Sequence, residues 1–269
     1  MAKNWDYAAG IVWPVLTERA AGRKTITYQE IAPTIGTNPL SVGRALGPIQ
    51  DYCLEARLPP LTSIVIGKNS KVPGPGFIAW DVDDLEAGQR QVFDFGWWAV
   101  GNPYGAFKPN DSAESLAEQL TIDPGKASQV YAIVRVRGVA QRVFKAALMK
   151  AYDSQCAFCG LSFDVALQGC HILPWGKSSH AQRLDPRNGL LLCSSHHSLF
   201  DNRLMTISRS FNIVYRDMTM EWTAYSKSDK ALTISLAGKR ALLPNDCKLW
   251  PSRELLQARH KLDEWEDLA

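Results

Sequence analysis

Two short cysteine and histidine pairs constrain this chain more than any other feature of its sequence. Cys156 and Cys159 stand in CAFC, and Cys193 and His196 stand in CSSH, with residues 160–192 between the two pairs. Thiolate and imidazole groups are the usual ligands of closed tetrahedral zinc sites, and two tight turns can each present two ligands from opposite sides. The spacing therefore predicts a structural zinc ion that joins two distant parts of the chain. The alternative is a set of unrelated buried cysteines beside a helix.

The remaining cysteines fit a reducing environment. The chain has six cysteines in 269 residues, and Cys53 and Cys247 stand apart from the others, as small buried hydrophobic residues do. No stretch of about 18 apolar residues occurs, and the N-terminal sequence MAKNWDYAAG contains no apolar signal core. We therefore expect a cytoplasmic protein with no membrane partner, in which clustered cysteines bind metal and form no disulfides.

Length and composition allow two domains. A hydrophobic content of 46% can supply packed cores, whereas a net charge of +3 is too small to identify a polyanionic partner. We expect an N-terminal domain over 1–100 and a C-terminal domain over 129–269. The segment 101–128 is rich in Pro, Gly, Asn and Ser, so we interpret it as the linker between them.

The N-terminal pattern predicts three helices followed by a β-hairpin. Residues 5–20 and 41–58 have helical periodicity, and Thr27 with Glu30 forms a capping-box signature for another helix that begins near Tyr28. The runs LTSIVIG at 61–67 and FIAWDV at 77–82 are typical of strands, with turn-forming residues between them. This order is the plan of a winged helix, and the expected fold class of the whole chain is α+β.

The stretch between the two metal-binding pairs carries three further polar residues in a definite order. His171 ends a strand-like run in CHILP, Asn188 precedes the apolar run GLLLC, and His197 directly follows His196. Successive residues of a helix are rotated by about 100°, so His196 and His197 face different surroundings. A strand, a loop, a strand and a helix would then bring the three residues to one site. Helices are also expected over 137–152 and 252–265, and a strand within 231–244.

This arrangement resembles the HNH endonucleases, whose ββα-metal motif is named after a histidine, an asparagine and a histidine in this order. The resemblance lies in RGVAQRVFKAALMKAYDSQCAFCG, CHILPW and RNGLLLCSSHHSLFDNRLMTIS, and it extends over roughly 135–262. It implies a divalent-metal-dependent DNA endonuclease with structural zinc and with Mg²⁺ or Mn²⁺ as the catalytic ion. It also implies that His171 is the general base, that Asn188 orients the loop and the base or touches the ion, and that His197 binds the ion.

One position departs from the family pattern. Many family members have an aspartate or a histidine directly before the base histidine, as a second ligand of the catalytic ion, but this chain has Cys170. A thiol is a poor ligand for magnesium. The nearest carboxylates along the chain are Asp185 and Asp201, and the sequence assigns neither. Competition of Cys170 for the zinc ion stays open as well.

A second resemblance concerns the N-terminal half. The segment TYQEIAPTIGTNPLSVGRALG resembles the winged-helix DNA-binding part of alkylguanine-DNA alkyltransferases and alkyltransferase-like proteins, over 25 to about 78. Their alkyl-accepting cysteine has no counterpart, because Thr62 stands near its position, so alkyl transfer is not expected. The resemblance implies binding of double-stranded DNA, and extrusion of a base into a pocket is one mode of binding that it allows. We assign the DNA contacts to Tyr28, Asn38, Ser41, Arg44 and the wing lysines Lys68 and Lys71.

Three functions remain open from the sequence. The first is a restriction-type DNA endonuclease whose winged helix reads a modified base, with a homodimer as one way to cut both strands. The second is a noncatalytic, zinc-stabilised winged-helix DNA-binding regulator, favoured by the missing ligand at Cys170. The third is a nuclease for RNA or branched DNA. A winged helix that makes only nonspecific phosphate contacts is compatible with each of them.

Overall fold

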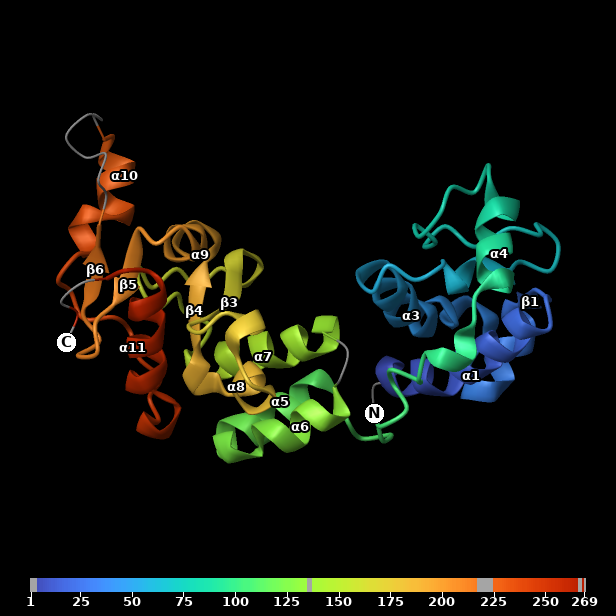
Figure 1. The fold of residues 1–269 in the computed structure, drawn as a ribbon, viewed down its shortest axis with the longest axis horizontal. Coiled ribbons are helices and arrows are strands. Elements are labelled where there is room, and N and C mark those ends of the chain that lie inside the picture. The colour runs from blue at the N-terminus through green and yellow to red at the C-terminus, as the bar shows by residue number, and fades with distance from the viewer. Residues whose placement is uncertain (1–3, 135–136, 217–224, 266–267, 269) are drawn as a thin grey trace. The chain divides into compact units, whose positions relative to one another are not determined.

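The computed structural model describes residues 4–134, 137–216, 225–265 and 268. Short sheets alternate with many helices along these residues, which confirms the α+β class (Figure 1). The chain divides into two compact units: residues 1–112 with 132–139 form one, and residues 113–131 with 140–269 form the other. The segment 101–128, expected to be a linker, contains helix α5 (Ala113–Ile122), whose Leu116, Ala117 and Leu120 are buried in the second unit.

Four helices build the first unit: α1 (Trp5–Ala21), α2 (Tyr28–Ile31), α3 (Gly43–Glu55) and α4 (Leu85–Asp94). The predicted capping box is present, because the Thr27 side chain accepts from the Glu30 amide while the Glu30 carboxylate accepts from the Thr27 amide. The core between α1 and α3 is aromatic at its centre. Trp13 packs edge-on against Tyr52 and Trp97, with ring centroids 5.6 and 5.9 Å away.

The predicted β-hairpin of the winged helix is wrong. Strand β2 (Val65–Ile66) pairs in parallel with β1 (Ile26–Thr27), and residues 77–82 form no strand. A side chain forms hydrogen bonds with the backbone here instead. The buried side-chain amide of Gln50 accepts from the Ile78 N–H at 3.0 Å and donates to the Gly76 carbonyl at 3.2 Å. The prolines in VPGPG also remove backbone donors that a hairpin would need. The helices are therefore present, but a winged helix is not confirmed.

The second unit is built around a β-hairpin. Strands β3 (Leu167–His171) and β4 (Gly189–Cys193) pair antiparallel, with Leu167 opposite Cys193 and His171 opposite Gly189. Helix α9 (Ser194–Asp201) follows β4 directly. The other elements are α6 (Ala127–Ile133), α7 (Arg137–Ala151), α8 (His180–Leu184), α10 (Lys227–Leu232), α11 (Arg253–Leu262) and the hairpin of β5 (Met205–Ile207) with β6 (Ile213–Tyr215).

The strand predicted within 231–244 is wrong. The Ser226 side chain and the Asp229 carboxylate form a capping box that begins α10, and a 3₁₀ turn over Ile234–Leu236 follows. A single bridge between Asn212 and Arg240 is the only ladder pairing of this segment within the described residues. Helical turns therefore occupy the first part of this segment in place of a strand. No helix among the described residues is long and apolar enough to cross a membrane.

Helix α7 lies against the β3–β4 hairpin at two glycines. A Cβ atom on Gly189 would lie 2.7 Å from the Phe144 ring and 2.8 Å from Leu148, and one on Gly169 would lie 3.2 Å from the Lys145 Cα. Every residue of β4 is buried. The absence of a side chain at these positions lets the helix approach the hairpin backbone closely.

We expect Gly189→Ala to lower the free energy of unfolding by about 1–3 kcal/mol, because the added methyl overpacks the contact with α7. Chemical denaturation followed by tryptophan fluorescence measures this change. Gly176→Ala is the matched control, since a Cβ atom there meets nothing within 4 Å. Equal stability of the two variants would contradict the tight helix–hairpin contact.

Candidate functional site

The four residues of the two cysteine and histidine pairs come together as the sequence predicts. Ligand atoms of Cys156, Cys159, Cys193 and His196 all lie within 4.8 Å of one another. The His196 Nδ1 atom lies 3.1 Å from the Cys193 sulfur and 3.4 Å from the Cys156 sulfur. Three of the four residues are buried and Cys159 is exposed. Three thiols and one imidazole in this arrangement can bind a zinc ion as a closed structural site.

The orientation of His196 suits this role. Its Nε2 atom lies 2.9 Å from the Leu232 carbonyl oxygen, at the end of α10. A carbonyl only accepts, so Nε2 carries the proton and Nδ1 keeps its lone pair toward the sulfurs. Burial opposes ionisation of the Cys156 thiol, but hydrogen bonds from the backbone amides of Phe158, Cys159 and Cys193 favour its thiolate and lower its pKa. A metal-binding thiolate is thereby favoured.

His171 is held by its Nε2 atom at the end of β3. This atom lies 2.9 Å from the carbonyl oxygen of Arg183, which follows in the loop between the strands. The imidazole stacks on the Phe144 ring of α7, with centroids 3.9 Å apart and planes 11° apart, and it meets Trp175 edge-on. Because Nε2 must donate to a carbonyl, the neutral ring keeps its lone pair on Nδ1. Nδ1 is therefore the atom that can take up a proton.

Asn188 organises the loop from its centre. It is completely buried, and its Oδ1 atom accepts from the Leu173 N–H at 2.8 Å. Its Nδ2 atom donates to the Gln182 carbonyl at 2.9 Å and lies 3.2 Å from the Ser178 hydroxyl oxygen. Gln182 directly precedes Arg183, whose carbonyl holds His171. Of the two roles that the sequence leaves open for Asn188, the geometry fits orientation of the loop and the base.

A second cluster contains Cys170, the residue directly before His171. Ligand atoms of Cys170, His197 and Asp201 all lie within 4.8 Å of one another. His197 and Asp201 are one turn apart on α9, with Nε2 and Oδ2 separated by 3.3 Å. The His197 Nδ1 atom is hydrogen-bonded to the Gln168 side-chain oxygen. His196 and His197, adjacent in sequence, thus belong to two different clusters.

The charges around this cluster favour an ionised Asp201. A hydrogen bond from His197 is the largest influence and lowers the pKa of Asp201 against the opposing effect of burial, and the nearby Arg259 guanidinium lowers it further. Burial raises the pKa of the Cys170 thiol well above its usual value, and the charge of Asp201 raises it further. An anionic carboxylate, an imidazole and a neutral thiol therefore stand together. A bound cation would favour loss of the thiol proton.

Asp185 has a different role from Asp201. Its carboxylate accepts from the Arg187 backbone N–H at 2.9 Å, which caps a short helical turn, and it is paired with the Arg187 guanidinium at 2.7 Å. These contacts assign Asp185 to the structure of the loop. Asp201 is the carboxylate that reaches the second cluster, and only its position in space distinguishes it.

An arginine clamp near the base has no counterpart in the sequence prediction. The guanidinium of Arg183 lies over the rings of Trp175 and Tyr131, 4.9 and 5.6 Å from their centroids. Its Nη1 donates to the Tyr131 hydroxyl at 2.7 Å and its Nε to the Trp175 carbonyl at 3.2 Å. These contacts fix the residue whose carbonyl orients His171. An isolated arginine in a polar loop gave no signal of this role.

The residues assigned to DNA contact lie in separate settings in the first unit. Arg44 is exposed on α3, with its guanidinium over the Trp5 ring at 5.7 Å. Asn38 caps the 3₁₀ turn before α3, since its side chain accepts from the Ser41 N–H at 3.0 Å. Lys68 and Lys71 are exposed in the turn after β2. Tyr28 lines a pocket together with Pro39 and Leu40, which lie between Asn38 and Ser41 in the chain.

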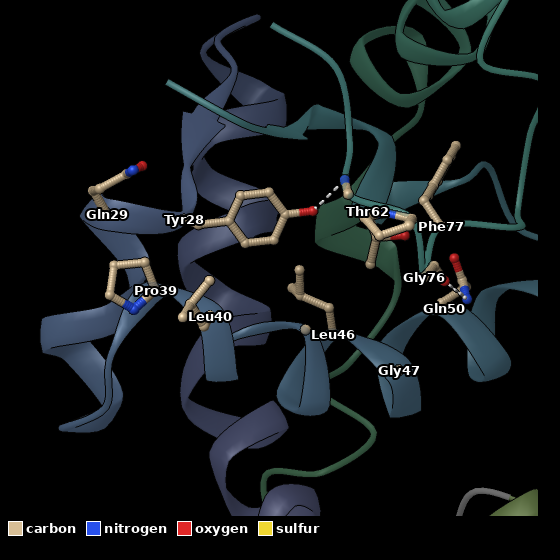
Figure 2. Close-up of a pocket in the computed structure, with 13 residues that line it drawn as sticks. Tyr28, Gln29, Pro39, Leu40, Leu46, Gly47, Gln50, Thr62, Gly76 and Phe77 are labelled. Carbon is tan, nitrogen blue, oxygen red and sulfur yellow. Dashed lines mark hydrogen bonds between the residues drawn. The ribbon is translucent and has the colours of Figure 1, made fainter. Parts of the chain in front are cut away.

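This pocket has a volume of about 400 Å³ and a mostly apolar lining (Figure 2). One face of α3 contributes Gly43, Leu46, Gly47 and Gln50, and the opposite wall is the segment 74–77. The Tyr28 hydroxyl of α2 accepts from the Gly74 N–H at 2.8 Å and so joins α2 to the segment 74–77. The Thr62 hydroxyl is buried without a hydrogen-bond partner among the described residues. The pocket can therefore take an apolar group that carries one hydrogen-bonding atom.

Loss of one ligand of the Cys156 cluster should remove one metal ion. We expect Cys159→Ser to lower the zinc content of the purified protein by one equivalent and to lower its melting temperature, because structural zinc sites contribute to folding. Cys247→Ser is the control, because Cys247 is also exposed but lies outside the cluster. Metal analysis by mass spectrometry gives the content, and equal zinc in both variants would contradict the assignment.

Comparison with known proteins agrees with the geometry of the second unit. Residues 156–208 match the family model described as HNH endonuclease. A comparison with curated proteins gave no match. Among solved structures, one described as "Modification dependent TagI restriction endonuclease" is similar at 18% sequence identity and a TM-score of 0.32, over 47% of this chain and 40% of that one. This likeness is too weak to indicate a shared fold. The family match makes the segment of β3, β4 and α9 an HNH endonuclease domain.

Proposed function

We propose that the protein is a divalent-metal-dependent DNA endonuclease of the restriction type. The single observation that carries this proposal is the orientation of His171, whose Nε2 is bound to the Arg183 carbonyl while Nδ1 keeps its lone pair. A histidine fixed in this tautomer can act as the general base in hydrolysis of a phosphodiester, and the nearby cluster of ion ligands can hold a cation against the phosphate. The HNH family match at 156–208 supports the same reaction class.

Each polar residue then has a distinct task. His171 takes a proton from water at Nδ1, and the resulting hydroxide attacks the phosphorus atom. His197 and Asp201 hold the divalent ion, with Cys170 beside them. Such an ion, when bound, neutralises negative charge on the phosphate and on the departing sugar oxygen. Asn188 and Arg183 keep the base in position, and zinc in the Cys156 cluster joins β4 and α9 to the turn after α7.

The first unit is proposed to bind double-stranded DNA and to read a modified base. The proposal is supported by the pocket beside Tyr28 and Thr62 and by the exposed cations Arg44, Lys68 and Lys71. A volume of about 400 Å³ is sufficient for one extruded base with a small apolar substituent. Asn38 and Ser41 lie on the turn that precedes α3, next to the pocket residue Pro39. An extruded base that lacks the apolar substituent would fill this pocket less completely.

Cleavage of both strands requires either two HNH sites or two successive reactions at one site. The chain contains one HNH segment, so we propose a homodimer or two successive nicks. A cytoplasmic location belongs to the same proposal, because a restriction enzyme meets foreign DNA there and its thiols stay reduced.

The central test uses one plasmid prepared from methylating and non-methylating hosts. With magnesium, manganese or cobalt added, we expect the wild type to cut the methylated plasmid, and His171→Ala to cut at least about 100-fold more slowly while still binding it. Gel electrophoresis measures cutting, and a mobility shift measures binding. His180→Ala is the control, because His180 stacks on Tyr131 and contacts neither metal cluster.

Other outcomes of this experiment select among the alternatives. Equal cutting of both plasmids would keep the nuclease and remove the dependence on those marks. Binding without cutting by the wild type, with any of the three ions, would favour the noncatalytic zinc-stabilised regulator, for which the thiol of Cys170 is the specific observation. Faster cutting of RNA or branched DNA would contradict a double-stranded target.

The pocket is tested by filling it. A Cβ atom on Gly47 meets nothing within 4 Å, so Gly47→Leu places an apolar side chain at the pocket without a backbone clash. Because leucine also favours a helix over glycine, folding should not suffer. We expect cutting of the modified plasmid to fall at least about tenfold, the loss that follows when a base contact worth roughly 1.4 kcal/mol is removed.

The matched control is Gly101→Leu, in the same unit, where a Cβ atom also meets nothing within 4 Å and no pocket wall is touched. Unchanged zinc content in both variants would show that the nuclease unit is intact. If Gly47→Leu cut the modified plasmid at the wild-type rate, the pocket would have no part in reading DNA.

A further inference from the structure

The cluster of Cys170, His197 and Asp201 combines three different kinds of ligand. A thiol comes from β3, and an imidazole and a carboxylate come from one side of α9, with all three ligand atoms within 4.8 Å of one another. None of them belongs to the zinc cluster of Cys156. A site of oxygen ligands alone would be typical of magnesium, and this site is different.

The imidazole of His197 is oriented toward this cluster. Gln168 donates through Nε2 to the Ser194 hydroxyl at 3.2 Å, and Ser194 in turn donates to the Ala166 carbonyl at 3.2 Å. The side-chain oxygen of Gln168 is thereby turned to the His197 Nδ1–H. The remaining atom, Nε2, lies 3.3 Å from Asp201 Oδ2, so a cation bound between them would replace the proton that otherwise joins the two groups.

The thiol is directed to the same side by the strand. Side chains two residues apart on a strand lie on one face, so Cys170 projects from β3 on the same face as Gln168. Cys170 is completely buried, whereas Asp201 is exposed. An ion bound by all three would therefore have a sulfur ligand from the interior and an accessible side toward solvent, where a phosphate oxygen can bind.

We propose that this site selects a divalent ion of the borderline transition-metal class, such as zinc, cobalt or nickel, over magnesium, with the Cys170 thiolate as a direct ligand. Magnesium requires octahedral oxygen ligands and binds thiolate poorly, whereas borderline ions accept sulfur, nitrogen and oxygen together. Binding releases the thiol proton to water. The inference deepens the proposed nuclease function and rests on it only in regarding the ion as catalytic.

Cobalt tests the site because a thiolate ligand gives Co²⁺ a near-ultraviolet charge-transfer band. The experiment uses the full chain, with zinc retained in the closed four-ligand cluster and the open site emptied by mild chelation. On titration with Co²⁺ we expect one further equivalent to bind and to produce the band of a single thiolate. Cys170→Ser should lose the band and bind Co²⁺ at least about tenfold more weakly. A large excess of Mg²⁺ should leave the wild-type band unchanged.

The control is Cys53→Ser, which removes a buried thiol of the first unit and should leave the band intact. Zinc content and melting temperature verify that each variant is folded. Should Cys170→Ser fail to fold, the wild-type titration alone decides: binding of Co²⁺ without a thiolate band, or displacement of Co²⁺ by Mg²⁺, overturns the proposal.

DNA cleavage is measured separately, so that the two proposals can fail independently. A thiolate-bound Co²⁺ in a protein that cuts no DNA would keep this site and contradict the nuclease function. Cleavage that is supported by Mg²⁺ and unchanged in Cys170→Ser would keep the nuclease and overturn the ion assignment.

Discussion

The four ligands of the Cys156 cluster join the parts of the second unit that carry its polar site. Cys156 and Cys159 lie in the turn after α7, while Cys193 and His196 lie at the junction of β4 and α9. Two backbone hydrogen bonds support this junction: Ala157 donates to the Leu191 carbonyl at 2.7 Å, and Leu242 donates to the Ala157 carbonyl at 2.8 Å. A metal ion bound here would fix the start of α9, and with it the direction of His197. The second cluster therefore depends on the first one, although they share no residue.

Two adjacent residues of β3 contact different helices. Cys170 projects toward α9, whereas His171 stacks on Phe144 of α7, because side chains alternate along a strand. The loop between the strands then supplies everything that orients His171. Asn188 donates to the Gln182 carbonyl, and the next carbonyl, of Arg183, accepts from His171. In this arrangement Asn188 orients His171 through two consecutive backbone groups.

The sequence predicted those features that depend on local chemistry or on strict spacing. The capping box of Thr27 and Glu30, the two cysteine and histidine pairs and the two strands that flank the loop are of this kind. It failed where a distant side chain satisfies the backbone, as Gln50 does for Ile78, and where helical turns occupy part of an apolar run, as α10 and the turn over Ile234–Leu236 do. It could not distinguish Asp201 from Asp185, because only tertiary packing separates them. The clamp on Arg183 depends on Tyr131, far away in the chain.

The proposed role of His171 depends on its tautomer. A neutral imidazole with its lone pair on Nε2 could not donate a hydrogen bond to the Arg183 carbonyl. Its Nδ1 would already carry the proton and could not accept one from water. Nitrogen chemical shifts of the His171 imidazole, assigned by comparison with His171→Ala, measure this directly. The account predicts that the neutral ring carries its proton on Nε2 and that Nδ1 has the shift of an unprotonated nitrogen. A proton on Nδ1 in the neutral ring would contradict it.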